Sequence, residues 1–189
     1  SHIPGLKVVV PATPYDAKGL LKSAIRDDNP VVFFEDKMMY QLKGPVPEEE
    51  YTIALGVADI KRVGTDITLV ATSSMVQIAL EAADSLDRAD ISAEVIDVRT
   101  TVPLDKETLI GSVRKTSRAM VIDEGYESYG VTAEIASVIA EGAFYYLDAP
   151  VRRMGAMDVP VPFSPVLEDQ TVPTSERVVE TALMLCKKR

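Results

Sequence analysis

The hydrophobic pattern at the start of the chain predicts one strand–helix–strand unit. Two short runs, Lys7–Val10 and Val31–Phe34, are apolar at nearly every position, which is typical of strands buried on both faces. Between the two runs, apolar residues recur at helical spacing, and Pro14 suits the first turn of a helix. These apolar positions are Ala17, Leu20, Leu21 and Ala24. The order predicts a right-handed βαβ unit of a parallel sheet.

A unit of about 36 residues is too small to cover both faces of its own sheet. We therefore expect residues 1–43 to be the remnant of a larger α/β domain whose earlier strands are absent. The chain begins with Ser1 rather than methionine and soon enters its first apolar run, as expected of a fragment. The segment Gly44–Glu50 combines two prolines with three acidic residues, so residues 44–51 are expected to be an extended, solvated connection.

Strand and helix patterns alternate through residues 52–189 and predict a second domain. Large apolar residues recur at every second position in Tyr51, Ile53 and Leu55 and suggest a lead-in strand with one solvated face. Further strands are expected at 67–71, 91–98 and 119–122, with a short one at 151–154. The alternation predicts a three-layer α/β domain with a mainly parallel sheet, and a proline-rich loop follows its last strand.

Four helices of this half have apolar stripes or recognisable caps. Ser73 or Ser74 is expected to cap the first, Asp105 the second and Thr174 the last, and the third is expected to begin near Gly130. The stripes consist of Val76, Ala79, Leu80, Ala83 and Leu86; of Ile135, Val138, Ile139, Gly142 and Tyr146; and of Val179, Ala182, Leu183 and Cys186. Lys187, Lys188 and Arg189 follow the last helix, where cations favour the negative end of its dipole.

Composition excludes several classes of partner and compartment. The chain has 29 acidic and 20 basic residues, and its net charge of −9 disfavours binding to nucleic acid or to an anionic membrane, so electrostatic partners should be basic. No run approaches the ~18 apolar residues of a membrane span, and no signal peptide is recognisable. A single cysteine, Cys186, forms no intramolecular disulfide, so a reducing cytoplasmic compartment is expected.

Few residues offer chemistry, and the absences exclude several mechanisms. His2 is the only histidine, which argues against a Ser-His-Asp triad and excludes a zinc site of two histidines within the chain. The sequence contains no phosphate-binding loop and no Gly-x-Gly-x-x-Gly fingerprint.

The remaining polar motifs each have a structural alternative that the sequence favours. Asp123-Glu124 and the Thr72-Ser73-Ser74 turn lie at strand ends where ligands gather in open α/β sheets, yet solvated loops and helix caps look the same. Arg152-Arg153 suits a carboxylate or phosphate, or balances the acidic surface. Cys186 is expected to be a small buried side chain. Asp27-Asp28-Asn29 offers oxygen ligands for a cation as well as an ordinary turn.

Several linked motifs carry a family resemblance that covers nearly the whole chain. They are His2–Pro11, Asp16–Leu21, Asp97–Thr100, Pro103–Asp105, Lys115–Arg118, Gly130 with Ala133–Ile135, Ala149–Arg153 and Asp158–Pro162. In order and spacing the chain resembles the beta subunits of the decarboxylating component of 2-oxo acid dehydrogenase complexes, and those of acetoin dehydrogenase.

The resemblance implies a transketolase-like C-terminal domain from about residue 52, preceded by the last part of a pyrimidine-binding domain. In that family, alpha and beta subunits form a heterotetramer that holds thiamine diphosphate and magnesium, and the acyl group passes to the lipoyl-lysine of an acyltransferase core. The cofactor carries the difficult chemistry. The implied partners are therefore an alpha subunit, a second beta subunit and the subunit-binding domain of a dihydrolipoyl acyltransferase.

The resemblance assigns no catalytic or cofactor-binding residue to this chain. The family's activating glutamate and active-site histidine match sequence upstream of Ser1, and His2 matches a different histidine, in a His-x-Pro-Gly motif. Some family members bind a structural monovalent cation, potassium being the candidate, through a loop that matches Ala24, Asp27 and Asn29.

The resemblance implies part of a pyruvate or acetoin dehydrogenase that is inactive alone, in the cytoplasm or, in a eukaryote, the mitochondrial matrix. Branched-chain 2-oxo acids rank behind pyruvate and acetoin as substrates. Two alternatives stay open: the C-terminal domain of another transketolase-like enzyme, and a purely interacting module.

Overall fold

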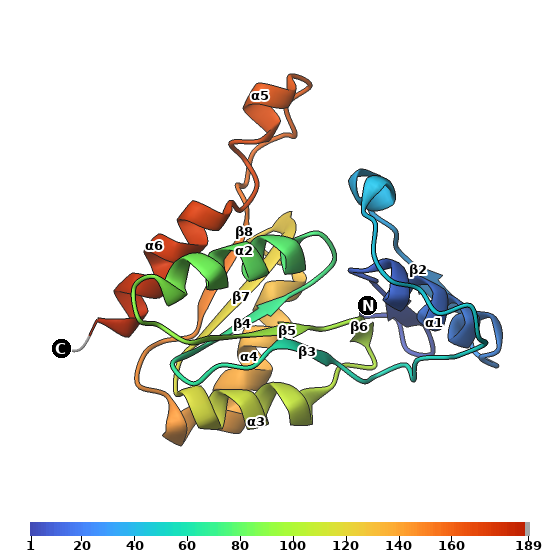
Figure 1. Ribbon diagram of the computed structural model, residues 1–189, viewed down its shortest axis with the longest axis horizontal. Helices are drawn as coiled ribbons and strands as arrows, with labels where there is room; N and C mark the ends of the chain where they lie inside the picture. Colours follow the sequence, from blue (N-terminus) through green and yellow to red (C-terminus); the bar gives the residue numbers. More distant parts are fainter. Residues whose placement is uncertain (188–189) are drawn as a thin grey trace.

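The structure is a computed structural model that describes residues 1–187, and it places two sheets side by side (Figure 1). The smaller sheet contains the expected βαβ unit: β1 (Lys7–Val9), α1 (Pro14–Ile25) and β2 (Val31–Phe33). β1 and β2 are parallel, with Lys7 opposite Val31. The Thr13 side chain caps α1 by accepting a hydrogen bond of 3.1 Å from the Asp16 N–H, and Pro14 occupies the first turn.

The third strand of the small sheet comes from the second half of the chain and was not predicted. β6 (Thr100–Val102) pairs antiparallel with β1, in the sheet order β2-β1-β6. A three-residue strand has no periodicity to detect, and its partner lies more than 90 residues upstream. This pairing joins the N-terminal βαβ unit to the second half of the chain.

The larger sheet confirms the predicted mainly parallel α/β architecture. Its order is β3-β5-β4-β7-β8, and only β3 is antiparallel to its neighbour. The strands are β3 (Asp59–Arg62), β4 (Ile67–Ala71), β5 (Ala93–Asp97), β7 (Ala119–Tyr126) and β8 (Arg152–Ala156). Strand β3 was not predicted, while β7 extends beyond the expected 119–122.

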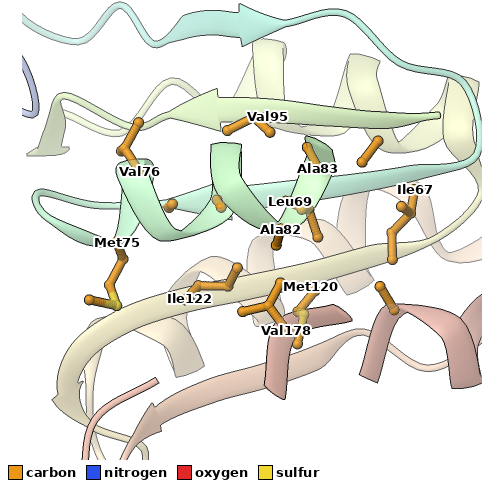
Figure 2. Packing of buried hydrophobic residues seen from close by; sticks show 14 of the residues in the cluster. Ile67, Leu69, Met75, Val76, Ala82, Ala83, Val95, Met120, Ile122 and Val178 are labelled. Atoms are coloured by element: carbon orange, nitrogen blue, oxygen red, sulfur yellow. The ribbon is translucent and has the colours of Figure 1, made fainter. Parts of the chain in front are cut away.

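Helices cover both faces of this sheet and complete the three layers (Figure 1). On one face lie α2 (Met75–Asp87) and α6 (Ser175–Cys186), and on the other α3 (Lys106–Thr116) and α4 (Val131–Ala143). Alternate side chains of β4 serve the two faces, since Ile67 and Leu69 pack with α2 and α6, while Val70 packs with α3 and α4. Figure 2 shows the first of these cores, with Val76 and Val178 directed toward the strands.

The predicted lead-in strand at residues 51–55 is wrong, because the described chain has no helix or strand between residues 42 and 58. The alternation arises from packing on α1. The Tyr51 ring stacks on Tyr15 at 4.6 Å, and buried Ile53 joins Val9 and Leu20 in a small core. The exposed 44–50 segment precedes it as expected, although the division into domains 1–43 and 52–189 stays a prediction.

Helix ends differ from expectation in two places. The helix from Gly130 stops at Ala143, so Tyr146 lies in a 3₁₀ turn, η2 (Phe144–Tyr146). Ser74 occupies the cap position of α2, but its side chain makes no capping hydrogen bond. Asp105 and Thr174 cap α3 and α6 as predicted. Lys187 directly follows α6, and the expected cations Lys188 and Arg189 lie outside the described residues.

Two segments project from the layers (Figure 1). One is η1 (Lys37–Gln41), a 3₁₀ helix that follows β2. The other is residues 157–172, called the arm below, which joins β8 to α6 and contains α5 (Pro165–Glu168). Across residues 1–187, no helix is long and apolar enough to cross a membrane.

Gly64, in the loop between β3 and β4, packs closely against the backbone at the start of β5. A Cβ at this position would lie 2.2 Å from the carbonyl carbon of Ala93, whereas a Cβ on exposed Gly111 of α3 would meet nothing within 4 Å. Gly64→Ala should lower the free energy of unfolding by about 1–3 kcal/mol. Gly111→Ala should raise it by about 0.5–1 kcal/mol, since alanine favours helix. Urea unfolding of both variants measures the difference, and equal stabilities would contradict this packing.

Candidate functional site

Five charged side chains meet where α1 contacts β3 and the end of β5. The Arg99 guanidinium donates to Asp16 Oδ1 through Nε at 2.9 Å and through Nη2 at 2.5 Å. Its Nη2 also lies 2.9 Å from Asp59 Oδ2. Lys61 Nζ bridges Asp16 at 2.6 Å and Asp59 at 2.7 Å. The fifth member is Asp97, and both Asp16 and Asp97 are fully buried. This set is called the buried ion network below.

Local backbone geometry directs Arg99 into this network. Asp97 ends β5, and its Oδ1 accepts a hydrogen bond of 2.9 Å from the Arg99 N–H. Arg99 has a φ of 58°, which is a left-handed conformation. The hydrogen bond from its N–H to the Asp97 side chain, two residues earlier, helps to hold this conformation. The turn leads the chain from β5 into β6, and the Arg99 side chain reaches Asp16 on α1.

Burial and charge shift the pKa values of the two fully buried acids of the network in opposite directions. The pKa of Asp97 rises to about 6, mainly because burial penalises its charged form, which Lys61 only partly offsets. Its Oδ2 has no hydrogen-bond partner in the described chain, and Lys61 Nζ lies 3.4 Å away. Burial also pushes the pKa of Asp16 upward, but hydrogen bonds from Lys61 and Thr13 outweigh it and hold that pKa below its usual value.

A second polar cluster lies at the carboxyl ends of β4 and β7. The Thr72 hydroxyl donates to Asp123, and the Ser74 hydroxyl donates to Glu124 at 2.7 Å. Ser73, between them, has a φ of 48°. The structure therefore joins two motifs that the sequence singled out separately, because parallel neighbours end at the same edge of a sheet.

The electrostatics of this edge are acidic. Partial burial raises the pKa of Glu124, the Ser74 hydrogen bond lowers it, and the nearby charges of Asp36 and Asp123 raise it further. Within residues 1–187, no group of three His, Cys, Asp or Glu side chains is placed to hold a metal ion. The edge therefore supplies hydrogen-bond acceptors and negative charge rather than a chelating site.

The predicted cation residues lie at the end of α1, which contains Ala24, and in the turn between α1 and β2, which contains Asp27 and Asn29. Asp27 Oδ1 accepts hydrogen bonds from the Asn29 N–H at 2.9 Å and from Asn29 Nδ2 at 3.0 Å, and Asp27 Oδ2 is paired with Lys7. Lys7 and Asn29 hold the pKa of Asp27 at about 2. Because the carboxylate already has these partners, the turn offers a cation mainly its carbonyl oxygens, including that of Ala24.

The other polar residues singled out in the sequence lie apart from both clusters. Arg153 Nη1 donates to the Glu127 carbonyl at 2.6 Å, while Arg152 is exposed on the edge strand β8. Cys186 packs beside the core under α6, and burial raises the pKa of its thiol. His2 is exposed and lines an open cavity beside Val102 and Gly130.

Sequence reasoning missed the buried ion network. Asp16 and Arg99 lie 83 positions apart, so no local pattern connects them. A signal was nevertheless present, because both residues belong to motifs that carry the family resemblance.

The comparisons with known proteins agree with this geometry. A family model described as "Transketolase, C-terminal domain" matches residues 56–178. The chain belongs to this family. A second model, "Transketolase, pyrimidine binding domain", matches residues 1–43.

Relatives of this transketolase C-terminal domain protein include dehydrogenase subunits from Bacillus subtilis (strain 168). One is the acetoin:2,6-dichlorophenolindophenol oxidoreductase subunit beta, which is 52% identical over 98% of this chain and 54% of its own length. Another is the pyruvate dehydrogenase E1 component subunit beta, 51% identical over 95% of this chain and 55% of its own. The resemblance to these beta subunits is confirmed, and the chain spans about half the length of these relatives.

A solved structure has the same fold. It is titled "Split gene transketolase, inactive beta4 tetramer", and it matches with a TM-score of 0.76 and 27% identity. The match covers 98% of this chain and 60% of the other.

Asp97 makes the stability of this protein depend on pH. Its pKa is raised in the folded state, so its favourable contribution is complete below about pH 4 and is lost as the pH rises through about 6. Asp97→Asn removes this loss of stability at higher pH, because asparagine does not ionise. The stability of Asp97→Asn relative to wild type should therefore increase between pH 4 and 7 by on the order of 2 kcal/mol.

Urea unfolding of both proteins at each pH measures this change. Exposed Asp28, changed to Asn, controls for the loss of one surface carboxyl group. A wild-type-to-variant difference that stays constant across this range would contradict the raised pKa.

Proposed function

We propose that this chain is the C-terminal part of the beta subunit of a thiamine-diphosphate-dependent pyruvate or acetoin dehydrogenase. Its contribution there is subunit assembly and docking to the acyltransferase core, and it is inactive alone. The observation that carries the proposal is the identity of 52% and 51% to an acetoin and a pyruvate enzyme subunit over nearly the whole chain. The 2-oxoisovalerate dehydrogenase subunit beta of Bacillus subtilis, at 44% identity, supports branched-chain 2-oxo acids less strongly.

The described residues do not fit the cofactor by themselves. Magnesium prefers several carboxylate and carbonyl oxygens, and residues 1–187 contain no metal-holding group of three acidic, histidine or cysteine side chains. We therefore assign binding of thiamine diphosphate and magnesium to the parent complex, and no step of the chemistry to this chain. The buried ion network supports a structural role, because it fixes α1 against the larger sheet.

The proposed partners are an alpha subunit, a second beta subunit and the subunit-binding domain of a dihydrolipoyl acyltransferase. A net charge of −9 supports basic protein partners rather than nucleic acid or an anionic membrane. The proposed compartment is the cytoplasm, or the mitochondrial matrix in a eukaryote. Supporting the latter, a relative from Arabidopsis thaliana at 45% identity is titled a mitochondrial pyruvate dehydrogenase subunit.

One alternative function has an observation in its favour. The similarity to a split-gene transketolase supports a C-terminal domain of another transketolase-like enzyme. Its 27% identity is well below the 52% of the acetoin enzyme subunit, so the dehydrogenase is preferred.

Co-expression with the alpha subunit of a pyruvate or acetoin dehydrogenase tests the main proposal. The 189-residue chain should co-purify with the alpha subunit. Alone, it should not decarboxylate pyruvate or reduce 2,6-dichlorophenolindophenol with acetoin in the presence of thiamine diphosphate and magnesium. The same assays with a complete beta subunit and its alpha subunit are the positive control. Turnover by the chain alone, or failure to bind any such alpha subunit, would contradict the proposal.

We also propose that the turn containing Ala24, Asp27 and Asn29 binds a structural potassium ion, largely through carbonyl oxygens. Because an ion bound only by the folded state stabilises it, the midpoint of thermal unfolding should rise by a few degrees in potassium chloride. Tetramethylammonium chloride at equal ionic strength is the reference. Identical midpoints in the two salts would rule out the site.

A further inference from the structure

The arm is a preorganised projection rather than a loose connection. Its two ends are joined, because the Met157 N–H donates to the Thr171 carbonyl at 2.9 Å. At its tip, the Asp169 N–H donates to the Pro165 carbonyl at 2.9 Å. Three prolines at 160, 162 and 165 further restrict the backbone. Figure 1 shows the arm extending beyond the helical layers, with α5 at its far end.

The apolar side chains of the arm point into solvent. Phe163 is fully exposed, and Val166 keeps 70% of its surface. The exposed apolar residues of the arm are Met157, Val159, Val161, Phe163, Val166 and Leu167. A contiguous segment of this kind is expensive to leave in water, and in soluble proteins it marks an interaction surface.

The arm and its surroundings carry more acidic than basic side chains, and the two flanking arginines, Arg153 and Arg177, donate to the carbonyls of Glu127 and Val172. Residues 154–176 contain no lysine or arginine, and their acidic residues are Asp158, Glu168, Asp169 and Glu176. The C-terminal part of β7 adds Asp123 and Glu124, and the turn after it adds Glu127, with no lysine or arginine among residues 123–130. The Ser128 hydroxyl donates to Asp158 at 2.5 Å and holds this turn against the base of the arm.

We propose that the arm is the docking surface for a different protein subunit, one that faces it with an apolar pocket rimmed by basic side chains. The inference rests on the proposed function, in which that subunit is the alpha subunit. Charge complementarity selects this occupant. A second copy of the chain carries the same acidic arm, so electrostatic repulsion opposes the pairing of two arms with each other.

The ordered backbone of the arm suits it to bind a partner subunit. Docking orders little additional backbone, because hydrogen bonds and prolines already fix the arm, and preorganisation lowers the entropic cost of association. An exposed aromatic side chain such as Phe163 is the kind of residue that carries a large share of binding energy once it is buried in a pocket.

The test uses the chain co-expressed with the alpha subunit. Val161→Ser with Phe163→Ser should weaken binding at least ~10-fold, because both side chains lose apolar burial. The matched control is Phe144→Ser with Tyr145→Ser, two exposed aromatic residues of η2. η2 follows the C-terminus of α4 and therefore lies at the opposite edge of the sheet from the arm.

A second pair of variants tests the charge. Glu168→Lys with Asp169→Lys should weaken binding and flatten its dependence on salt, since like charges then face each other. Glu81→Lys with Glu180→Lys, which reverses two exposed acids on α2 and α6, is the control for net charge. Unchanged thermal unfolding of the arm variants excludes misfolding as the cause.

The outcomes separate the arm from the proposed function. If the wild-type chain binds the alpha subunit and the arm variants bind equally well, the arm inference is overturned while the proposed function stands. If the arm variants change only the self-association of the chain, as light scattering would show, the occupant is a second copy and the inference is also wrong. If the wild-type chain binds no alpha subunit, the proposed function itself fails.

Discussion

The arrangement of the two sheets depends on a set of charges removed from water. Asp16 on α1 is fully buried, and Arg99 and Lys61 come from the other side of the junction to pair with it. Desolvated charges are tolerated only when they are paired, and removing one partner of a buried pair costs about 3–5 kcal/mol. The network is therefore less a source of net stability than a constraint on geometry, because moving α1 would take the Asp16 carboxylate away from both Arg99 and Lys61.

That constraint extends to the surrounding backbone. The turn that aims Arg99 at α1 also leads into β6, which closes the small sheet against β1. Ile53 packs against Gly19, where a Cβ would lie 2.6 Å from its side chain, so the connecting segment is held close to the same helix. These contacts hold the segment that matches the pyrimidine-binding family model against the three-layer part of the chain.

The features that support the proposed function lie on the surface of the chain. The carboxyl edge of the larger sheet, where open α/β proteins bind ligands, is occupied by hydroxyl–carboxylate pairs such as Ser74 with Glu124. The arm next to it carries six exposed apolar side chains, and Phe163 has no covering neighbour among residues 1–187. In the proposed function, this preformed projection is suited to holding another subunit.

The sequence by itself determined the elements that have a local signal. Continuous apolar runs gave β4, helical stripes gave α1 and α6, Asp105 and Thr174 marked helix starts, and linked motifs identified the family. Tertiary structure decided the rest. Strands β3 and β6 are too short to have a period, and the alternation at Tyr51 and Ile53 came from packing on a helix. The pairing of Asp16 with Arg99, and of Thr72 with Asp123, required distant segments to meet in space. Local patterns report which face of an element is buried, whereas partners far apart in the sequence are set by how the elements pack.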